Sequence, residues 1–145
     1  MEESLENFVE FKVKDFKKID KKIICLTYLK ETLKTNDAIF NNFIETYKNL
    51  LNEHKGCFVF IDSRNIRNIN YQSIATRMKE ISKLDKLVST NVIGVVYFMN
   101  SPVIKGMGNS IMRIYKPVVP TKFCDNNQEG FNFLMDVYSK KDKKE

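Results

Sequence analysis

The sequence contains 145 residues, a length that suits a single domain built around one hydrophobic core. Apolar residues make up 43% and charged residues 29% of the chain, and this balance excludes an intrinsically disordered protein. The net charge is +6, a modest basic excess without a groove-reading motif or an interleaved aromatic platform, so we do not expect a nucleic-acid partner.

Neither the first residues nor the longest apolar run carries a targeting or membrane signal. The chain starts with acidic and polar residues, whereas a secretory signal starts with basic residues followed by an apolar run. Residues 92–99 form the longest apolar run, about half of a membrane span. We therefore expect a soluble, cytoplasmic protein.

The cysteines and the histidine do not indicate a metal centre. Cys25, Cys57 and Cys124 are widely spaced, no CxxC pair exists, and His54 is the only histidine. A structural zinc site needs more closely spaced ligands. We expect three free thiols in a reducing compartment, no metal and no cofactor.

The first half of the chain predicts a hairpin, a helix and a central strand. Alternation over residues 8–13 indicates a half-exposed strand, and the denser apolar run at 23–29 indicates a more buried one, with a polar turn at 15–22 between them. Asn36 or Asp37 caps the next helix, which ends at Lys55-Gly56. The unbroken apolar run at 57–61, followed by Asp62, is typical of a central strand covered on both faces.

The second half alternates helices and strands. Residues 71–88 predict a helix with an apolar side, and residues 92–99 predict the second central strand. Pro102 stands in the first turn of a third helix, which Pro117 and Pro120 end. A short strand at 121–124 and a helix at 127–138 follow. We assign residues 1–139 to one domain and residues 140–145 to a basic, flexible tail.

The element order β-β-α-β-α-β-α-β-α predicts an α/β fold. An N-terminal β-hairpin leads into a mainly parallel sheet flanked by four helices, with right-handed crossovers. Ligands and partners of such sheets bind at the loops that follow the carboxyl ends of the strands. In this chain those loops are residues 62–70 and 100–105.

Catalysis is not indicated by any motif. A Ser-His-Asp or Cys-His arrangement would have to use His54, which lies at the end of a predicted helix. Gly106 and Gly108 lie within a helix and lack a Walker lysine, so they do not form a phosphate loop. We expect neither an enzyme nor a small-molecule substrate.

The predicted helix at 102–116 carries more apolar surface than one core contact needs. One stripe along it consists of Val103, Met107, Ile111 and Tyr115. The apolar residues outside that stripe are Ile104, Met112 and Ile114. This composition indicates either a deeply buried helix or one that faces a partner, a lipid or a membrane.

The order of elements over residues 8–138 resembles that of STAS domains, the fold of bacterial anti-sigma-factor antagonists. The apolar strand 58–62 is similar to the central strand of that family, which also ends in Asp, and residues 66–74 stand where the family has a loop and a helix start. Tyr71 or Gln72 occupies the position of the family's phosphorylated Ser. The resemblance implies a regulatory module that binds a protein partner.

A second resemblance is to CRAL-TRIO lipid-transfer domains. That family places Asn-x-Pro after a central strand, followed by a helix that ends in Lys-Pro and gates a lipid cavity. The matching residues here are Asn100-Ser101-Pro102 and Lys116-Pro117. The resemblance implies an amphipathic ligand beneath the helix.

Two functional hypotheses follow, with different candidate residues. In the first, a protein partner binds the loops after the central strands, through Asp62, Arg64, Arg67, Asn68, Asn70, Tyr71, Asn100, Ser101 and Lys105. In the second, a lipid or membrane surface is bound through Ile104, Lys105, Met107, Gly108, Ile111, Met112, Arg113 and Lys116.

Overall fold

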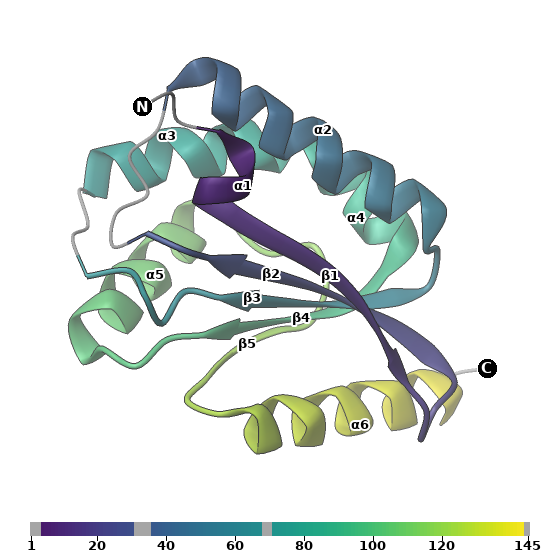
Figure 1. The fold of residues 1–145 in the computed structure, drawn as a ribbon. Coiled ribbons are helices and arrows are strands. Elements are labelled where there is room, and N and C mark those ends of the chain that lie inside the picture. The colour runs from purple at the N-terminus through teal and green to yellow at the C-terminus, as the bar shows by residue number, and fades with distance from the viewer. Residues whose placement is uncertain (1–3, 31–35, 68–70, 144–145) are drawn as a thin grey trace.

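Residues 4–30, 36–67 and 71–143 are described in a computed structural model (Figure 1). The elements in chain order are α1 (Leu5–Phe8), β1 (Val9–Phe16), β2 (Lys21–Tyr28), α2 (Asp37–Glu53), β3 (Cys57–Asp62), α3 (Tyr71–Ile81), the 3₁₀ turn η1 (Ser82–Leu84), α4 (Asp85–Asn91), β4 (Val92–Phe98), α5 (Pro102–Ile114), β5 (Thr121–Cys124) and α6 (Asn127–Lys143).

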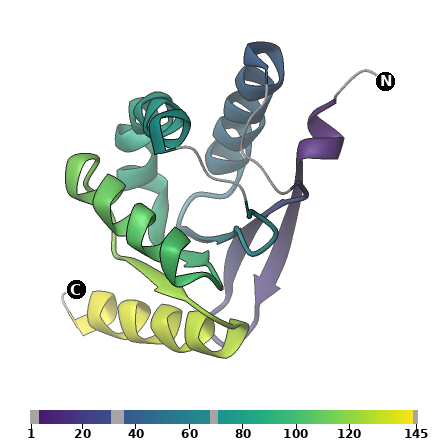
Figure 2. The same cartoon turned by 90° about the vertical axis from the view of Figure 1, so that its left-hand side faces the viewer.

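The five strands lie in the sheet in chain order, β1-β2-β3-β4-β5. β1 and β2 form an antiparallel hairpin, and every later pairing is parallel. This arrangement confirms the predicted α/β fold with a hairpin leading into a mainly parallel sheet. Because successive parallel strands advance in one direction, crossovers of one hand place their helices on one face. Figures 1 and 2 show α2, α3 and α4 on one face and α6 on the other, with α5 beside α3.

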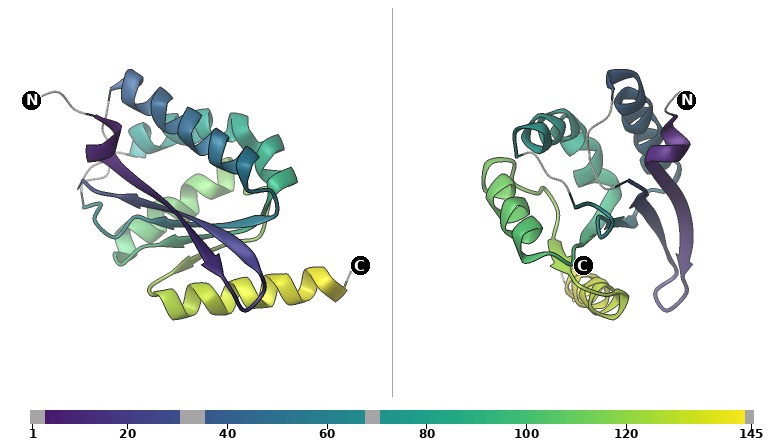
Figure 3. Two further views of the ribbon diagram at one scale, coloured as in Figure 1. Left: turned by 45° about the vertical axis from the view of Figure 1, so that its right-hand side comes forward. Right: turned by 60° about the vertical axis from the view of Figure 1, so that its left-hand side comes forward.

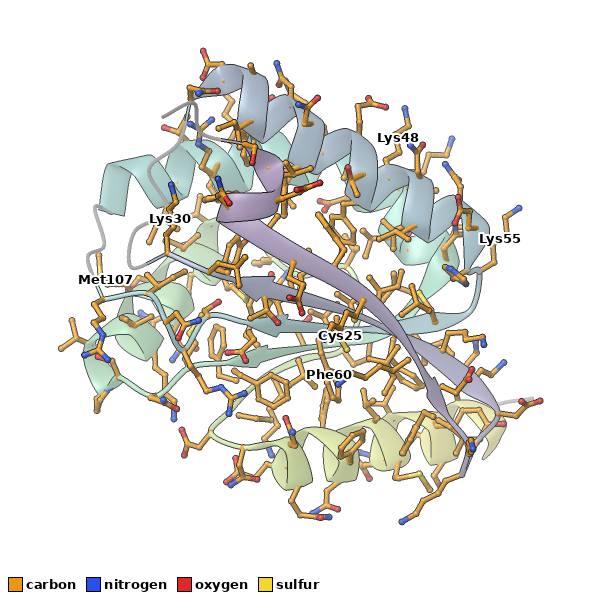
Figure 4. All side chains as sticks on the ribbon, viewed as in Figure 1. Cys25, Lys30, Lys48, Lys55, Phe60 and Met107 are labelled. Carbon is orange, nitrogen blue, oxygen red and sulfur yellow. The ribbon has the colours of Figure 1, made fainter. Side chains whose placement is uncertain are left out.

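The face covered by α6 is packed with aromatic rings. Phe60 of β3 lies with its ring centroid 5.0 Å from that of Phe98 in β4 and 5.4 Å from that of Phe131 in α6. Figure 4 labels Phe60 in the layer between the sheet and α6. Gly130 allows this approach, since a Cβ on it would lie 3.0 Å from the ring of Phe98. α6 therefore lies close against the sheet.

The opposite face is packed unevenly. The stripe of α2 is almost completely buried, with Phe43 2% and Leu51 0% exposed. The apolar residues of α3, by contrast, are only half-buried, although the sequence pattern predicts them as core: they are Ile74, Met78 and Ile81. The space between α3 and α2, which lie side by side over the sheet (Figure 3), is therefore incompletely filled.

The structure differs from the predicted elements at several places. The turn predicted over 15–22 is shorter, since β1 runs to Phe16 and β2 starts at Lys21. The helix predicted over 71–88 is broken by η1, because the hydroxyl of Ser82 donates to the Lys79 carbonyl (2.7 Å) and Asp85 starts α4. The short helix α1 precedes the first strand and was not predicted. α6 extends to Lys143, so residues 140–143 of the predicted tail are helical, and an ion pair between Lys140 and Asp136 links successive turns there.

Two glycines in helices provide a matched test of this packing. We expect Gly130→Ala to lower the free energy of unfolding by about 1 kcal/mol or more, since the new methyl would press on the buried ring of Phe98. Gly106→Ala should raise it by up to about 1 kcal/mol, because nothing lies within 4 Å of that Cβ and alanine favours the helix. Urea denaturation measures both. If both substitutions changed the free energy of unfolding by the same amount in the same direction, the close packing of α6 against the sheet would be contradicted.

Candidate functional site

A cavity of about 80 Å³ lies beneath α5, at the carboxyl ends of the central strands. Tyr28 ends β2 and Tyr97 lies near the end of β4, so the sheet supplies the floor of the cavity. The lining residues from the helices are Ile74 and Met78 of α3 and Ile104, Gly108, Ile111 and Met112 of α5. The cavity thus lies at the edge of the sheet where parallel α/β folds bind ligands.

Two further cavities adjoin it. One, of about 110 Å³, shares Tyr28, Met78, Tyr97 and Met112 with the first and is also lined by Tyr47. The other, of about 50 Å³, lies between α2 and α3 and again includes Tyr28 and Met78. Because the three cavities share side chains, they form a chain of spaces between the sheet and the helix layer.

Five hydroxyl-bearing side chains line these spaces without a hydrogen bond to any described residue. The four that come from the sheet, the loop after β3 and α2 are Tyr28, Tyr97, Ser63 and Tyr47, and the fifth is Tyr115 at the C-cap of α5. Ser63 is 6% and Tyr47 is 5% exposed. A buried hydroxyl without a partner costs about 1–3 kcal/mol. Apolar side chains at these positions would avoid this cost. The hydroxyls therefore indicate that the cavities are not only defects of packing.

The tyrosines stay protonated throughout the physiological range. Burial raises the pKa of Tyr97 to about 12. Burial raises the pKa values of Tyr28 and Tyr47 even further, and the neighbouring Tyr97 adds to both shifts. Each phenol is therefore a neutral group that can donate one hydrogen bond and accept others.

The apolar stripe counted from the sequence does not coincide with the buried side of α5. Val103, a member of that stripe, is 71% exposed, whereas Ile104, outside it, is 8% exposed. The helix is rotated because Gly108 faces the sheet, where its missing side chain allows the ring of Phe123 to approach (3.1 Å from an ideal Cβ). Ser101 begins the helix in this orientation by accepting a hydrogen bond from the Ile104 amide.

The residues proposed for lipid contact divide into two sets. The set that lines the cavities consists of Ile104, Gly108, Ile111, Met112 and Lys116. Met107 is half-buried on the flank of α5 (Figure 4), and Arg113 is exposed. Lys105 forms an ion pair with Asp125 after β5. The apolar members of the first set thus face inward, not toward a membrane surface.

The polar loop after β3 is held by an internal ion pair. The Arg64 guanidinium donates to both carboxylate oxygens of Asp62, at 2.9 and 2.7 Å, and lies over the ring of Phe98. The Arg64 amide also donates to Asp62, as predicted for a carboxylate at a strand end. Burial alone would raise the pKa of Asp62, but the hydrogen bonds from Arg64 outweigh it and lower that pKa. Arg64 is therefore already engaged.

The other loop residues proposed for a protein partner are partly exposed and partly outside the described residues. Asn100 is exposed between β4 and α5, and Arg67 is exposed beyond β3. Asn68 and Asn70 lie outside the described residues. Tyr71 starts α3, but its side chain is not described. The loops 62–70 and 100–105 stand at the same edge of the sheet, as predicted, and their role in binding a partner stays a prediction.

Sequence reasoning missed the four hydroxyls. Tyr28 and Tyr97 were assigned only to strands, Tyr47 only to a helix stripe, and Ser63 only to a polar cluster. The signal available was a tyrosine at or next to the last position of two apolar strands, where an aliphatic residue would fill the core more simply. The sequence alone does not show that these positions meet.

Reactive and metal-binding groups are sparse in the part of the chain that the structure describes. No three side chains of His, Cys, Asp or Glu gather there as metal ligands, and no helix there is long and apolar enough to cross a membrane. The three thiols are free, and burial raises the pKa of Cys57 to about 11. His54 is the C-cap residue of α2.

These features define a small α/β domain with a mixed five-stranded sheet and a hydroxyl-lined cavity under one crossover helix. The chain belongs to the DUF7793 family, a domain of unknown function, whose model matches residues 17–138. The match begins after β1 and covers β2 to β5 and most of α6. No curated protein and no solved structure matches the chain.

Adjacent residues test the orientation of α5. We expect Ile104→Asp to lower the melting temperature strongly, because it would bury an unpaired carboxylate. Val103→Asp should leave the melting temperature nearly unchanged, because Val103 is 71% exposed. Thermal unfolding followed by circular dichroism measures both. If Val103→Asp lowered the melting temperature and Ile104→Asp did not, the orientation of α5 with Ile104 buried would be contradicted.

Proposed function

We propose that this chain is a non-catalytic binding module that holds an amphipathic small molecule beneath α5. The observation that carries the proposal is an apolar cavity at the carboxyl edge of the sheet, lined by the buried Ser63 and the half-buried Tyr28 and Tyr97, whose hydroxyls have no hydrogen bond to a described residue. The arrangement agrees with the CRAL-TRIO-like hypothesis, in which a helix after Asn-x-Pro covers the ligand. In this proposal the ligand is enclosed beneath α5, and α5 itself does not contact a membrane.

The cavity dimensions limit the size of the ligand. An apolar cavity of about 150 Å³ is needed to bind benzene. The cavities here are smaller, about 80 and 110 Å³, but they share four side chains. Two of those, Met78 and Met112, are flexible and adapt readily to an occupant. A narrow, extended molecule that spans both cavities fits, whereas a two-chain phospholipid is too large.

The side chains around the cavities favour ligand binding over catalysis. The hydroxyls are neutral, and burial raises the pKa values of the tyrosines instead of activating them. No described histidine or thiol lines the cavities beneath α5. Beneath Ile104 and Ile111, the described lining of the 80 Å³ cavity also contains no carboxylate or amine that could act as a base for a nucleophile. These facts support a binding role.

Filling the cavity provides a direct test with 1-octanol as the probe. We expect the methyl NMR signals of Met78, Met99 and Met112, which line the 80 Å³ cavity, to shift on titration, while that of Met135 on α6 stays in place. Met112→Trp should abolish the shifts by occupying the space. Met135→Trp, on an exposed position, should leave them unchanged. Shifts that persist in Met112→Trp would contradict the proposal.

A second candidate function is protein binding, as the STAS-like hypothesis holds. The specific observation in its favour is the outer side of α5, where Val103 is 71% and Ile114 is 64% exposed. Val103 lies in the first turn of α5, close to the exposed Asn100 in the loop expected to meet a partner, and Ile114 is the last residue of the helix. Cross-linking to a protein that binds the wild type but not the folded Val103→Asp variant would support this function. Equal capture by both would exclude α5 from the interface.

A further inference from the structure

Among the described residues, the 80 Å³ cavity is lined by three hydroxyl-bearing side chains and by no charged side chain. Ser63 follows β3, Tyr28 ends β2 and Tyr97 lies in β4, so three neighbouring strands each supply one group. Ser63 is held in place by its backbone, whose amide donates to the Phe98 carbonyl (2.9 Å) and whose carbonyl accepts from Ile66. The hydroxyl of Ser63 is thus positioned by main-chain bonds and left without a described partner.

We infer that the buried end of the ligand is an uncharged hydrogen-bonding group, an alcohol or a ketone, held by Ser63, Tyr28 and Tyr97. This inference rests on the proposed function and adds the chemical class of the ligand to it. Each hydroxyl both donates and accepts, so together they match an alcohol or a carbonyl oxygen. The apolar part of the ligand lies against Ile74, Ile104 and Ile111.

The charges near the cavity explain why the buried end is neutral. Two cations of the neighbouring loop and of α5 are already neutralised, Arg64 by Asp62 and Lys105 by Asp125. Neither of these arginine and lysine side chains lines the cavity. A carboxylate placed among the hydroxyls would lose its hydration without gaining a counter-ion, and that loss is costly.

The adjoining cavity has a different character and gives the ligand a direction. Asp85 and Lys116 line the 110 Å³ space, together with Tyr47. Burial raises the pKa of the Asp85 carboxyl above its ordinary value. Of the described residues that line the two cavities, the charged ones thus lie at this end of the path, whereas those beneath Ile104 and Ile111 are neutral. An extended ligand therefore places its neutral polar group at the uncharged end, beneath Ile104 and Ile111.

The test compares 1-octanol with octanoate, which have the same chain length and differ in charge. Titrations followed by methionine methyl NMR give the dissociation constants for the wild type, Tyr97→Phe and Tyr138→Phe. Tyr138 lies in α6 on the other face of the sheet and serves as the matched control. We expect the wild type to bind 1-octanol at least about ten-fold more tightly than octanoate.

The tyrosine variants separate recognition from packing. Tyr97→Phe should weaken 1-octanol binding about five-fold, the effect of one lost hydrogen bond, while Tyr138→Phe has no effect. Without ligand, Tyr97→Phe should melt at a higher temperature than the wild type, because it removes a buried hydroxyl that has no partner. A hydroxyl that served only the fold would give the opposite change in melting temperature.

The remaining outcomes distinguish a failure of the proposed function from a failure of the inferred ligand chemistry. Binding of neither probe would overturn the proposed function and this inference together. Equal binding of both probes, unaffected by Tyr97→Phe, would leave the cavity as a ligand site and overturn the chemistry inferred for its buried end. Tighter binding of octanoate would place a carboxylate at Lys116 with an apolar tail inward and would also overturn the inference.

Discussion

The parallel strands advance across the sheet in one direction, and this constraint governs how the two faces are covered. Because each crossover has the same hand, α2, α3 with α4, and α5 all lie on one face. Only α6, which follows the last strand, covers the other face. One helix covers that face closely through Gly130 and the rings of Phe60, Phe98 and Phe131.

Several helices on a single face must share the surface of the sheet, and here they do not fill it. α2 packs fully, with Phe43 and Leu51 buried, and α5 is drawn toward the sheet where Gly108 meets Phe123. α3 lies between them and keeps its apolar residues half-buried. The break at η1 is next to the largest of the cavities, which Ile81, Ser82 and Asp85 line. The cavities beneath α5 thus lie where the helices on this face leave the edge of the sheet incompletely covered.

Most of the architecture could be predicted because it depends on local patterns. The apolar runs at 57–61 and 92–99 identify the central strands, and Asn36 caps α2 as one of the two residues expected to do so. The orientation of α5 depends instead on Gly108 meeting Phe123, a contact between elements that no periodicity records. The cavity depends on hydroxyls from three separate strands or their ends, so it becomes visible only when the sheet order is known.

The central claim is that preformed space lies between the sheet and its crossover helices. A crystal structure of the protein under xenon pressure measures this most directly, because xenon enters apolar cavities of this size without needing a specific ligand. The account predicts xenon beside Met78 and Met112, where the two larger cavities meet. Xenon bound only elsewhere, or a helix layer closed tightly onto Tyr28 and Tyr97, would contradict it.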